Sequence, residues 1–223
     1  MPIRKRGGPL NPEKTRNSIV QAALLRLAER GPEGVSFSDI ARLAGVDRGT
    51  AHRHFENREE LLRATAKLVS DRLIEAVFGD RDRASKPIFE AAELLSRNER
   101  LIDFAMDNPE LCRVWLFEVL SSEDPSSDPF WRAFVGSYQR FAATNGAQAN
   151  LNTEVLAIIM LASTFLWPVW VRAHAKNEAE RRKLALGFSN ECMRLSMYGS
   201  LKPELFPEIA RHLQDVSSGD TAT

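Results

Sequence analysis

Four residues near position 50 combine side chains and spacing that suit contact with nucleic acid. The set comprises Arg48, Gly49, Thr50 and Arg53. Arginine can donate two hydrogen bonds to a guanine edge, and threonine can bond a base edge or touch a thymine methyl group. On a helix that starts after Asp47, these residues would lie along one polar face near its N-terminus. The spacing therefore favours a helix that enters the major groove of DNA, over the alternative of an ordinary solvated helix face.

Two short helices joined by a tight turn would position that set. Ser36 is a typical N-cap for a helix predicted over 37–44, and Asp47 is one for a helix over 48–54. Gly45 falls between them, where a helix-turn-helix needs a residue that tolerates positive φ. The pattern predicts a helix-turn-helix over about 36–55.

Further polar residues stand at the starts or edges of these helices, where DNA phosphates would pass. Backbone N–H groups at helix N-termini would add phosphate contacts. His52 and His54 are two positions apart and do not share a helix face, so no metal site is predicted. The predicted DNA-binding residues are Ser36, Ser38, Arg48, Gly49, Thr50, His52, Arg53 and Arg58.

The segment from Ser36 to Leu61, SFSDIARLAGVDRGTAHRHFENREEL, resembles the signature of the TetR family of regulators. The shared features are an Ile-Ala pair, Ala-Gly-Val, a Gly-Thr step and His-Phe before an acidic helix start. The family usually has Tyr at the position of His52 and a larger apolar residue at that of Ala51. In the family that Tyr reaches a phosphate, and His52 could act as a donor there with a shorter reach.

Helical periodicity with clear stops continues to the C-terminal region, and no run alternates as a strand would. We expect an all-α protein with an N-terminal three-helix DNA-binding domain and a C-terminal helical domain for ligand binding and dimerisation. The expected divisions are a flexible basic arm (1–10), the helix-turn-helix domain (11–57), a connecting helix (58–78), the helical ligand-binding and dimerisation domain (79–214) and a disordered tail (215–223). The later helices are expected at about 87–107, 109–120, 128–144, 153–175 and 178–200.

Charge is unevenly divided, although the whole chain is neutral. Residues 1–58 contain 11 Lys/Arg and 6 Asp/Glu, while residues 59–223 contain 19 and 24. This asymmetry suits an N-terminal part that approaches phosphate. Cys112 and Cys192 lie in apolar stretches and are expected to be reduced thiols of a cytoplasmic protein.

Membrane insertion and catalysis are both disfavoured. The basic residues 4–6 precede Gly-Gly-Pro instead of an apolar run, so no secretory signal is predicted, and the apolar stretch 155–171 fits a buried helix better than a membrane span. A helical enzyme is a weak alternative, because no nucleophile triad, phosphate loop or paired metal motif is recognisable. No cofactor or metal is predicted.

The resemblance implies a homodimer that binds palindromic double-stranded DNA, usually as a repressor. It also implies that a small-molecule effector releases the dimer from the DNA. Control by a protein partner is the alternative for the same fold. The last two long helices are the candidates for the dimer interface. The middle helices are rich in aromatic residues, which suit either a core or a pocket for an apolar or aromatic effector. The predicted effector-binding residues are Phe104, Trp115, Phe134 and Tyr138.

Overall fold

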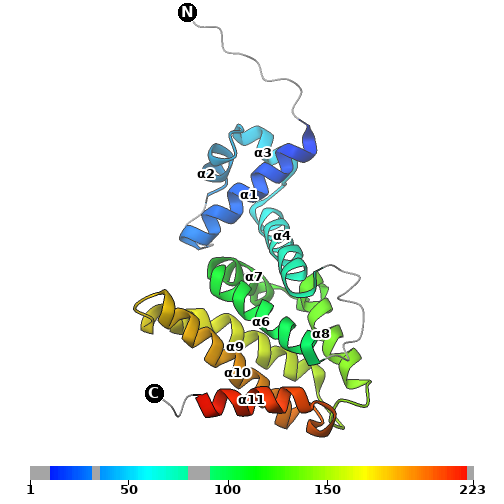
Figure 1. Cartoon of the computed structure of the whole chain (residues 1–223). Helices are drawn as coiled ribbons and strands as arrows, with labels where there is room; N and C mark the ends of the chain where they lie inside the picture. The colour runs from blue at the N-terminus through cyan, green and yellow to red at the C-terminus, as the bar shows by residue number, and fades with distance from the viewer. Residues whose placement is uncertain (1–10, 32–35, 80–90, 220–223) are drawn as a thin grey trace, which may run out of the picture. The chain divides into compact units, whose positions relative to one another are not determined.

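The computed structural model describes residues 11–31, 36–79 and 91–219, and in these ranges the chain is helical (Figure 1). The expected arm (1–10), residues 32–35 and 80–90, and residues 220–223 of the expected tail lie outside the described residues. The all-α expectation is confirmed, because the described residues contain a single isolated β-bridge, Ala147 with Leu201, and no named strand. The α-helices are α1 (Pro12–Arg30), α2 (Phe37–Leu43), α3 (Arg48–His54), α4 (Arg58–Phe78), α6 (Ala91–Asp107), α7 (Pro109–Ser121), α8 (Pro129–Ala142), α9 (Thr153–His174), α10 (Glu178–Gly199) and α11 (Pro207–Gly219).

Side-chain caps fix the starts of the N-terminal helices. The Oδ1 atom of Asn11 accepts from the amide of Glu13 at 3.0 Å, and Pro12 occupies the first turn of α1. The Ser36 hydroxyl accepts from the amide of Asp39 at 3.1 Å at the start of α2. These bonds satisfy amides that have no partner within their own helix. The cap predicted at Ser36 is confirmed.

Two compact units make up the described chain. Unit 1 contains the described residues up to Val69 together with Arg113–Ser122, and unit 2 contains Ser70–Cys112 and the described residues from Glu123. By these boundaries α4 and α7 each contribute residues to both units. The core of unit 1 is apolar and almost fully buried, and it includes Ile19, Leu27, Ile40, Ala51, Phe55 and Leu61.

The larger unit is built from α6, α8, α9, α10 and α11. One of its clusters packs Met197, Leu201 and Phe206 against two residues of α11, Ile209 and Leu213. The expected disordered tail (215–223) is wrong in part, because α11 continues to Gly219. Apolar residues four positions apart on α11 share a face, so the helix is held by core packing.

Helix α9 is the most apolar helix of unit 2. Among the described residues it alone is long and apolar enough to cross a membrane by length and composition, a test that a core helix of a soluble protein also passes. Ala157, Leu161 and Phe165 are buried along one face of α9. Pro168, also buried, lies within this helix. This buried face accounts for part of the apolar composition of α9.

Candidate functional site

The turn between α2 and α3 depends on one glycine. Gly45 has φ of 71°, a left-handed conformation that is unfavourable for residues with a Cβ atom. Its amide donates to the Arg42 carbonyl at 3.2 Å, and the amide of Val46 donates to the Ala41 carbonyl at 3.0 Å. The turn thus closes tightly and sets the direction in which α3 leaves α2.

A cap at Asp47 organises the first turn of α3. The carboxylate of Asp47 accepts from the amide and the hydroxyl of Thr50, both at 2.8 Å. The hydrogen bond from the Thr50 hydroxyl, followed by that from its amide, lowers the pKa of Asp47. The Thr50 hydroxyl in turn accepts from Nη2 of Arg53 at 2.7 Å. The three side chains form one chain of hydrogen bonds along α3.

A second group of side chains connects α3 to α2. The ring of His52 stacks on the ring of Phe37 with centroids 4.3 Å apart and an interplanar angle of 12°. Nε of Arg48 lies 3.4 Å from Nε2 of His52 and donates to it. Because Arg48 and His52 are both exposed, this arrangement orients an arginine at the outer surface of α3.

Most of the residues predicted to bind DNA lie on the surface of unit 1. Ser36, Ser38, Arg48, Gly49, His52 and Arg53 are exposed, and Arg58 is half-buried at the start of α4. The placement of Thr50 on the exposed polar face was wrong. Only 7% of Thr50 is exposed, and its hydroxyl is bonded to Asp47 and Arg53. The structure therefore gives Thr50 a role in positioning α3 and Arg53.

Gly49 has a geometric reason to be glycine even though its backbone is helical. A Cβ atom at this position would lie 3.2 Å from Oδ1 of Asp47, the atom that caps α3. A larger side chain would push against that cap. The absence of a side chain also leaves the exposed start of α3 open to close approach.

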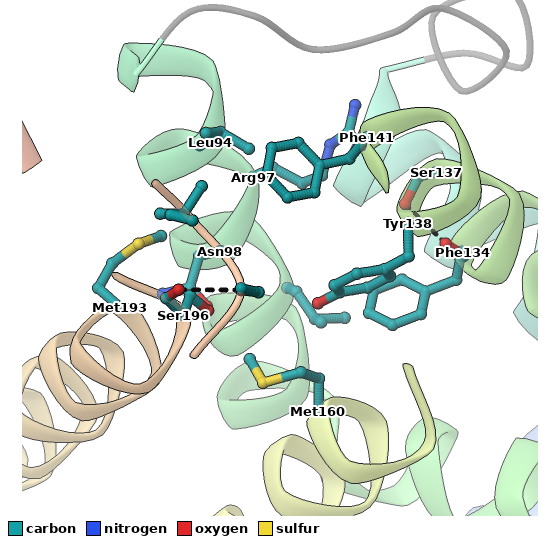
Figure 2. A pocket seen from close by; sticks show the side chains of 13 residues that line it. Leu94, Arg97, Asn98, Phe134, Ser137, Tyr138, Phe141, Met160, Met193 and Ser196 are labelled. Carbon is teal, nitrogen blue, oxygen red and sulfur yellow. Dashed lines mark hydrogen bonds between the residues drawn. The ribbon is translucent and has the colours of Figure 1, made fainter. Parts of the chain in front are cut away.

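Unit 2 contains a cavity of about 90 Å³ between α6, α8, α9 and α10 (Figure 2). Aromatic, aliphatic and sulfur-containing side chains form most of its wall, which is typical of small-molecule pockets. The lining residues are Leu94, Arg97, Asn98, Leu101, Phe134, Ser137, Tyr138, Phe141, Met160, Met193, Ser196, Ser200 and Leu201.

Two of the four predicted effector-binding residues line this cavity and two do not. Phe134 and Tyr138 lie against each other in its wall, with ring centroids 5.3 Å apart. Phe104 is half-buried in α6 outside the lining, and Trp115 is buried in the part of α7 that belongs to unit 1. Neither residue lines this cavity, and their assignment as pocket walls stays a prediction.

Sequence reasoning missed Arg97, the one charged side chain in the cavity wall. Its guanidinium carbon lies 4.6 Å from the ring centroid of Phe78, a cation–π contact. Burial lowers the pKa of Arg97 to about 10, although Glu93 acts in the opposite direction. Arg97 lies between Leu94 and Leu101 at helical spacing, so the signal that could have identified it is a charge within an apolar stripe.

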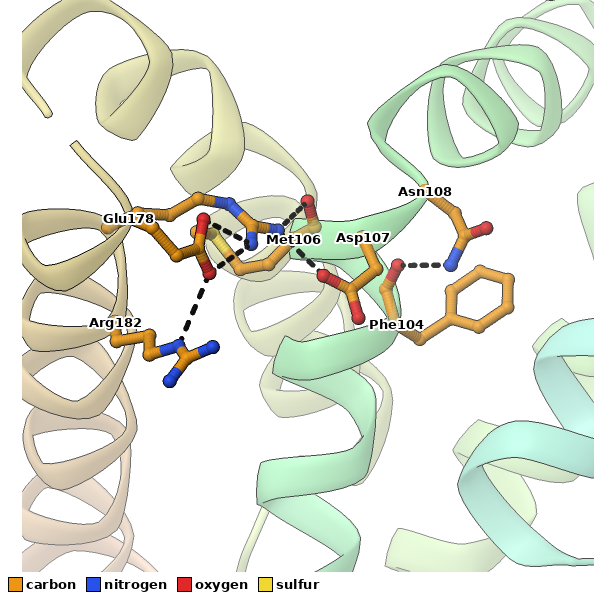
Figure 3. A network of polar contacts seen from close by, with 7 residues as sticks. Phe104, Met106, Asp107, Asn108, Glu178 and Arg182 are labelled. Carbon is orange, nitrogen blue, oxygen red and sulfur yellow. Dashed lines mark hydrogen bonds and ion pairs between the residues drawn. The ribbon is translucent and has the colours of Figure 1, made fainter. Parts of the chain in front are cut away.

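Polar contacts join the end of α6 to the start of α10 (Figure 3). Nη2 of Arg181 donates to Oδ1 of Asp107 and to the Met106 carbonyl, both at 2.7 Å. Glu178 lies 3.2 Å from Arg181 and 3.3 Å from Arg182. Hydrogen bonding to Asp107 raises the pKa of Arg181. The cation thus binds the C-terminal end of α6, where helix carbonyls favour positive charge.

An apolar face of α9 and α10 is exposed in the single chain. Its large side chains include Leu166 at 60% and Leu195 at 68% exposure. On α9 the exposed apolar side chains recur at helical spacing, and exposed apolar surface of this kind is typical of protein–protein interfaces. The full set is Val155, Ile158, Ile159, Leu166, Val169, Trp170, Leu186, Leu195 and Tyr198, and we call it the α9–α10 apolar face.

Comparisons with known proteins agree with this arrangement. Residues 19–65 match the family described as "Bacterial regulatory proteins, tetR family". The chain is 33% identical over 101 residues to the HTH-type transcriptional regulator BetI of Rhizobium meliloti (strain 1021), covering 45% of this chain and 48% of BetI. It is 42% identical over 76 residues to the HTH-type transcriptional repressor LfrR of Mycolicibacterium smegmatis, covering 34% and 39%. The matches thus span about half or less of these curated relatives.

A solved structure extends the similarity of fold to both units. The crystal structure of AibR in complex with isovaleryl coenzyme A and operator DNA superposes with a TM-score of 0.61 and 18% identity, over 79% of this chain and 97% of AibR. Identity at this level supports the fold alone. The sequence match carries the family assignment, and through residues 19–65 it assigns the N-terminal part of the chain to the TetR family of bacterial regulatory proteins.

Proposed function

We propose that this chain is a transcriptional regulator of the repressor type, which binds palindromic operator DNA as a homodimer and is released by a small molecule. The observation that carries the proposal is the exposed N-terminal part of α3. There Arg48, Gly49, His52 and Arg53 stand free of the core, directly after the turn at Gly45. Such a helix supplies base contacts, and the exposed hydroxyl of Ser38 near the start of α2 suits a phosphate.

Arg48 is the best candidate for a base contact. It is exposed, and its Nε bond to His52 limits the directions that the guanidinium can take. Its two Nη atoms then remain as donors suited to the O6 and N7 atoms of guanine. His52 itself is held by stacking on Phe37, so its distance from a phosphate would be set by α2 as well as by α3.

Dimerisation is supported by the α9–α10 apolar face. Apolar residues exposed on two long neighbouring helices would bury a substantial area against a second copy, and symmetric dimers are the commonest oligomers. Two recognition helices about 34–36 Å apart would then match one turn of DNA. Residues of the same helices that pack inward, such as Leu184 and Phe188, belong to the core of unit 2.

Control by a small molecule is supported by the cavity of unit 2. Its volume of about 90 Å³ exceeds by several times the roughly 10–15 Å³ that one water requires. A fully packed unit 2 would have favoured control by a protein partner. AibR, which has the same fold, was crystallised with both isovaleryl coenzyme A and operator DNA, and this supports joint control by ligand and DNA here.

The decisive experiment is selection of DNA bound by the full chain from a random pool. We expect an enriched inverted repeat, bound with two chains per site. Arg48→Ala should lower affinity for that site by about tenfold or more, since a good bidentate base contact contributes about 1–3 kcal/mol of discrimination. Arg182→Ala, an exposed arginine of α10, is the matched control. Enrichment of no sequence, or equal binding by Arg48→Ala and the parent chain, would refute the proposal.

A further inference from the structure

The cavity of unit 2 has an unusual balance of charge. Its wall contains one cation, Arg97, and no carboxylate among the thirteen described residues that line it. The nearby carboxylate of Glu93 is bound to Nη2 of Arg100 at 2.9 Å. Arg100 and Arg140 also act on the pKa of Arg97 as like charges. Positive charge therefore exceeds negative charge at this end of the cavity.

Arg97 has unmet capacity to donate. Its Nε is buried and has no hydrogen-bond partner among the described residues. A guanidinium carries five N–H donors, and the contact of Arg97 with the face of Phe78 satisfies its charge only partly. Leaving a buried charged donor unpaired is costly, whereas bonds between guanidinium and carboxylate are among the strongest that side chains form.

A second group in the wall, a phenol hydroxyl, can also donate. The Tyr138 hydroxyl has no hydrogen-bond partner within the described residues, and burial raises the pKa of this phenol, so it remains a donor at neutral pH. In Figure 2 this hydroxyl points into the space between α8 and the facing helices. By contrast, the hydroxyls of Ser137 and Ser200 donate to the Phe134 and Ser196 carbonyls.

We propose that the effector of this regulator is a small organic anion, a carboxylate with an apolar body, whose charged end is bound by Arg97 and Tyr138. The inference rests on the proposed function, because it specifies the ligand of the same pocket. The apolar body would lie against Leu101, Phe134 and Met160. The volume of about 90 Å³ favours acids with a short apolar chain, and hexanoate is taken as the probe.

The test compares small molecules that share a six-carbon chain and differ in the charge of their polar end. Hexanoate, hexanamide and hexylamine are titrated at pH 7 into the full-length protein by calorimetry, with butanoate and octanoate to bracket the length. We expect hexanoate to bind about tenfold or more tightly than hexanamide, because bonds to a charged group contribute about twice as much as neutral ones. Hexylamine should bind worst, since its ammonium would face Arg97.

Variants of the protein identify the side chain that causes the preference for a negatively charged probe. Arg97→Met should bind hexanoate and hexanamide equally weakly, and Arg97→Lys should keep part of the preference because it keeps the charge. Tyr138→Phe removes one donor and should weaken hexanoate several-fold while leaving hexanamide nearly unchanged. Arg182→Met, which removes an exposed arginine of the same unit, should bind like the parent chain. Circular dichroism and melting temperature establish that each variant is folded.

The outcomes separate this inference from the proposed function. The anion proposal is overturned if none of the carboxylates binds, if hexanamide binds the parent chain as well as hexanoate does, or if folded Arg97→Met keeps the preference. Where Arg97→Met does not fold, the comparison of probes on the parent chain and Tyr138→Phe decides. Operator binding is measured separately without any probe. If the protein binds operator DNA but fails the anion test, the proposed regulatory function stands and only the anion proposal is rejected. If the protein does not bind operator DNA, the proposed function is rejected, whatever the cavity binds.

Discussion

Filling the cavity of unit 2 should stabilise the protein and prevent effector binding at the same time. Ser196 of α10 lines the cavity, and Ser196→Leu would place an aliphatic side chain in it. At about 24 cal/mol per Å³, a void of about 90 Å³ corresponds to a ceiling of about 2 kcal/mol. One leucine fills part of that space, so we expect a gain of about 1 kcal/mol in the free energy of unfolding. For a chain of this size that corresponds to roughly 2–4 °C in melting temperature.

Calorimetric unfolding and hexanoate titration of the same variant provide the assay. Ser18→Leu is the control, because it makes the same change at an exposed position in the interior of α1 and reports the effect of helix propensity alone. A gain in Ser196→Leu beyond that of Ser18→Leu isolates the filling of the cavity. The reasoning fails if Ser196→Leu melts lower than the parent chain, as overpacking would cause, or if it binds hexanoate unchanged.

Three further substitutions test other parts of the structure. Gly45→Ala should destabilise the chain by about 1–2 kcal/mol, since alanine is strained at φ of 71°; an unchanged denaturation midpoint would contradict this. Hydrogen bonds depress the pKa of Asp47, so its contribution is present above the unfolded value near 3.8 and is lost as pH falls through the lower folded value. Asp47→Asn should therefore lose less stability than the parent chain on acidification from pH 5 to pH 2, and an equal loss in acid denaturation would exclude this role. Trp170→Glu on the α9–α10 apolar face should produce monomers in analytical ultracentrifugation, whereas Lys183→Glu, exposed on α10, should remain dimeric; a dimeric Trp170→Glu would assign the interface elsewhere.

The N-terminal unit was predictable because its structure is determined by local chemistry. The cap residues Ser36 and Asp47 and the glycine of the turn define the ends of α2 and α3 within a few positions of sequence. The exception is Thr50. Its side-chain type suits a base contact, but its hydroxyl is bonded to the cap carboxylate and to Arg53, and a sequence pattern does not reveal that competition.

The cavity was harder to predict because it depends on which faces of distant helices meet. Trp115 and Phe134 are equally plausible wall residues by type, yet only Phe134 lines the cavity, while Trp115 is buried in the core of the other unit. Helix α11 was missed for a related reason. Its apolar residues are few, and it is held by packing on α10 that local propensity does not encode.

The position of Arg97 suggests how an anion could act on the rest of the chain. Arg97 contacts Phe78, the last residue of α4, and Nε of Arg100 donates to the Val77 carbonyl at 3.0 Å. Two neighbouring arginines of α6 therefore bind the end of α4, which continues by sequence into unit 1. A carboxylate that draws Arg97 away from Phe78 would alter this attachment.

One discriminating hydrogen bond in each cavity of a dimer is enough to supply the energy required of such an effector. Moving a population from 1:99 to 99:1 takes a difference of about 5.5 kcal/mol between the two states. A single hydrogen bond to a charged group contributes about 1.5–3 kcal/mol, so one such bond, counted alone, falls short of this difference. Two effectors, each discriminating by about 2.7 kcal/mol, reach the total. Release from operator DNA should then depend on effector concentration with a Hill coefficient above 1, and a coefficient of 1 in anisotropy titrations would mean that one occupied cavity suffices.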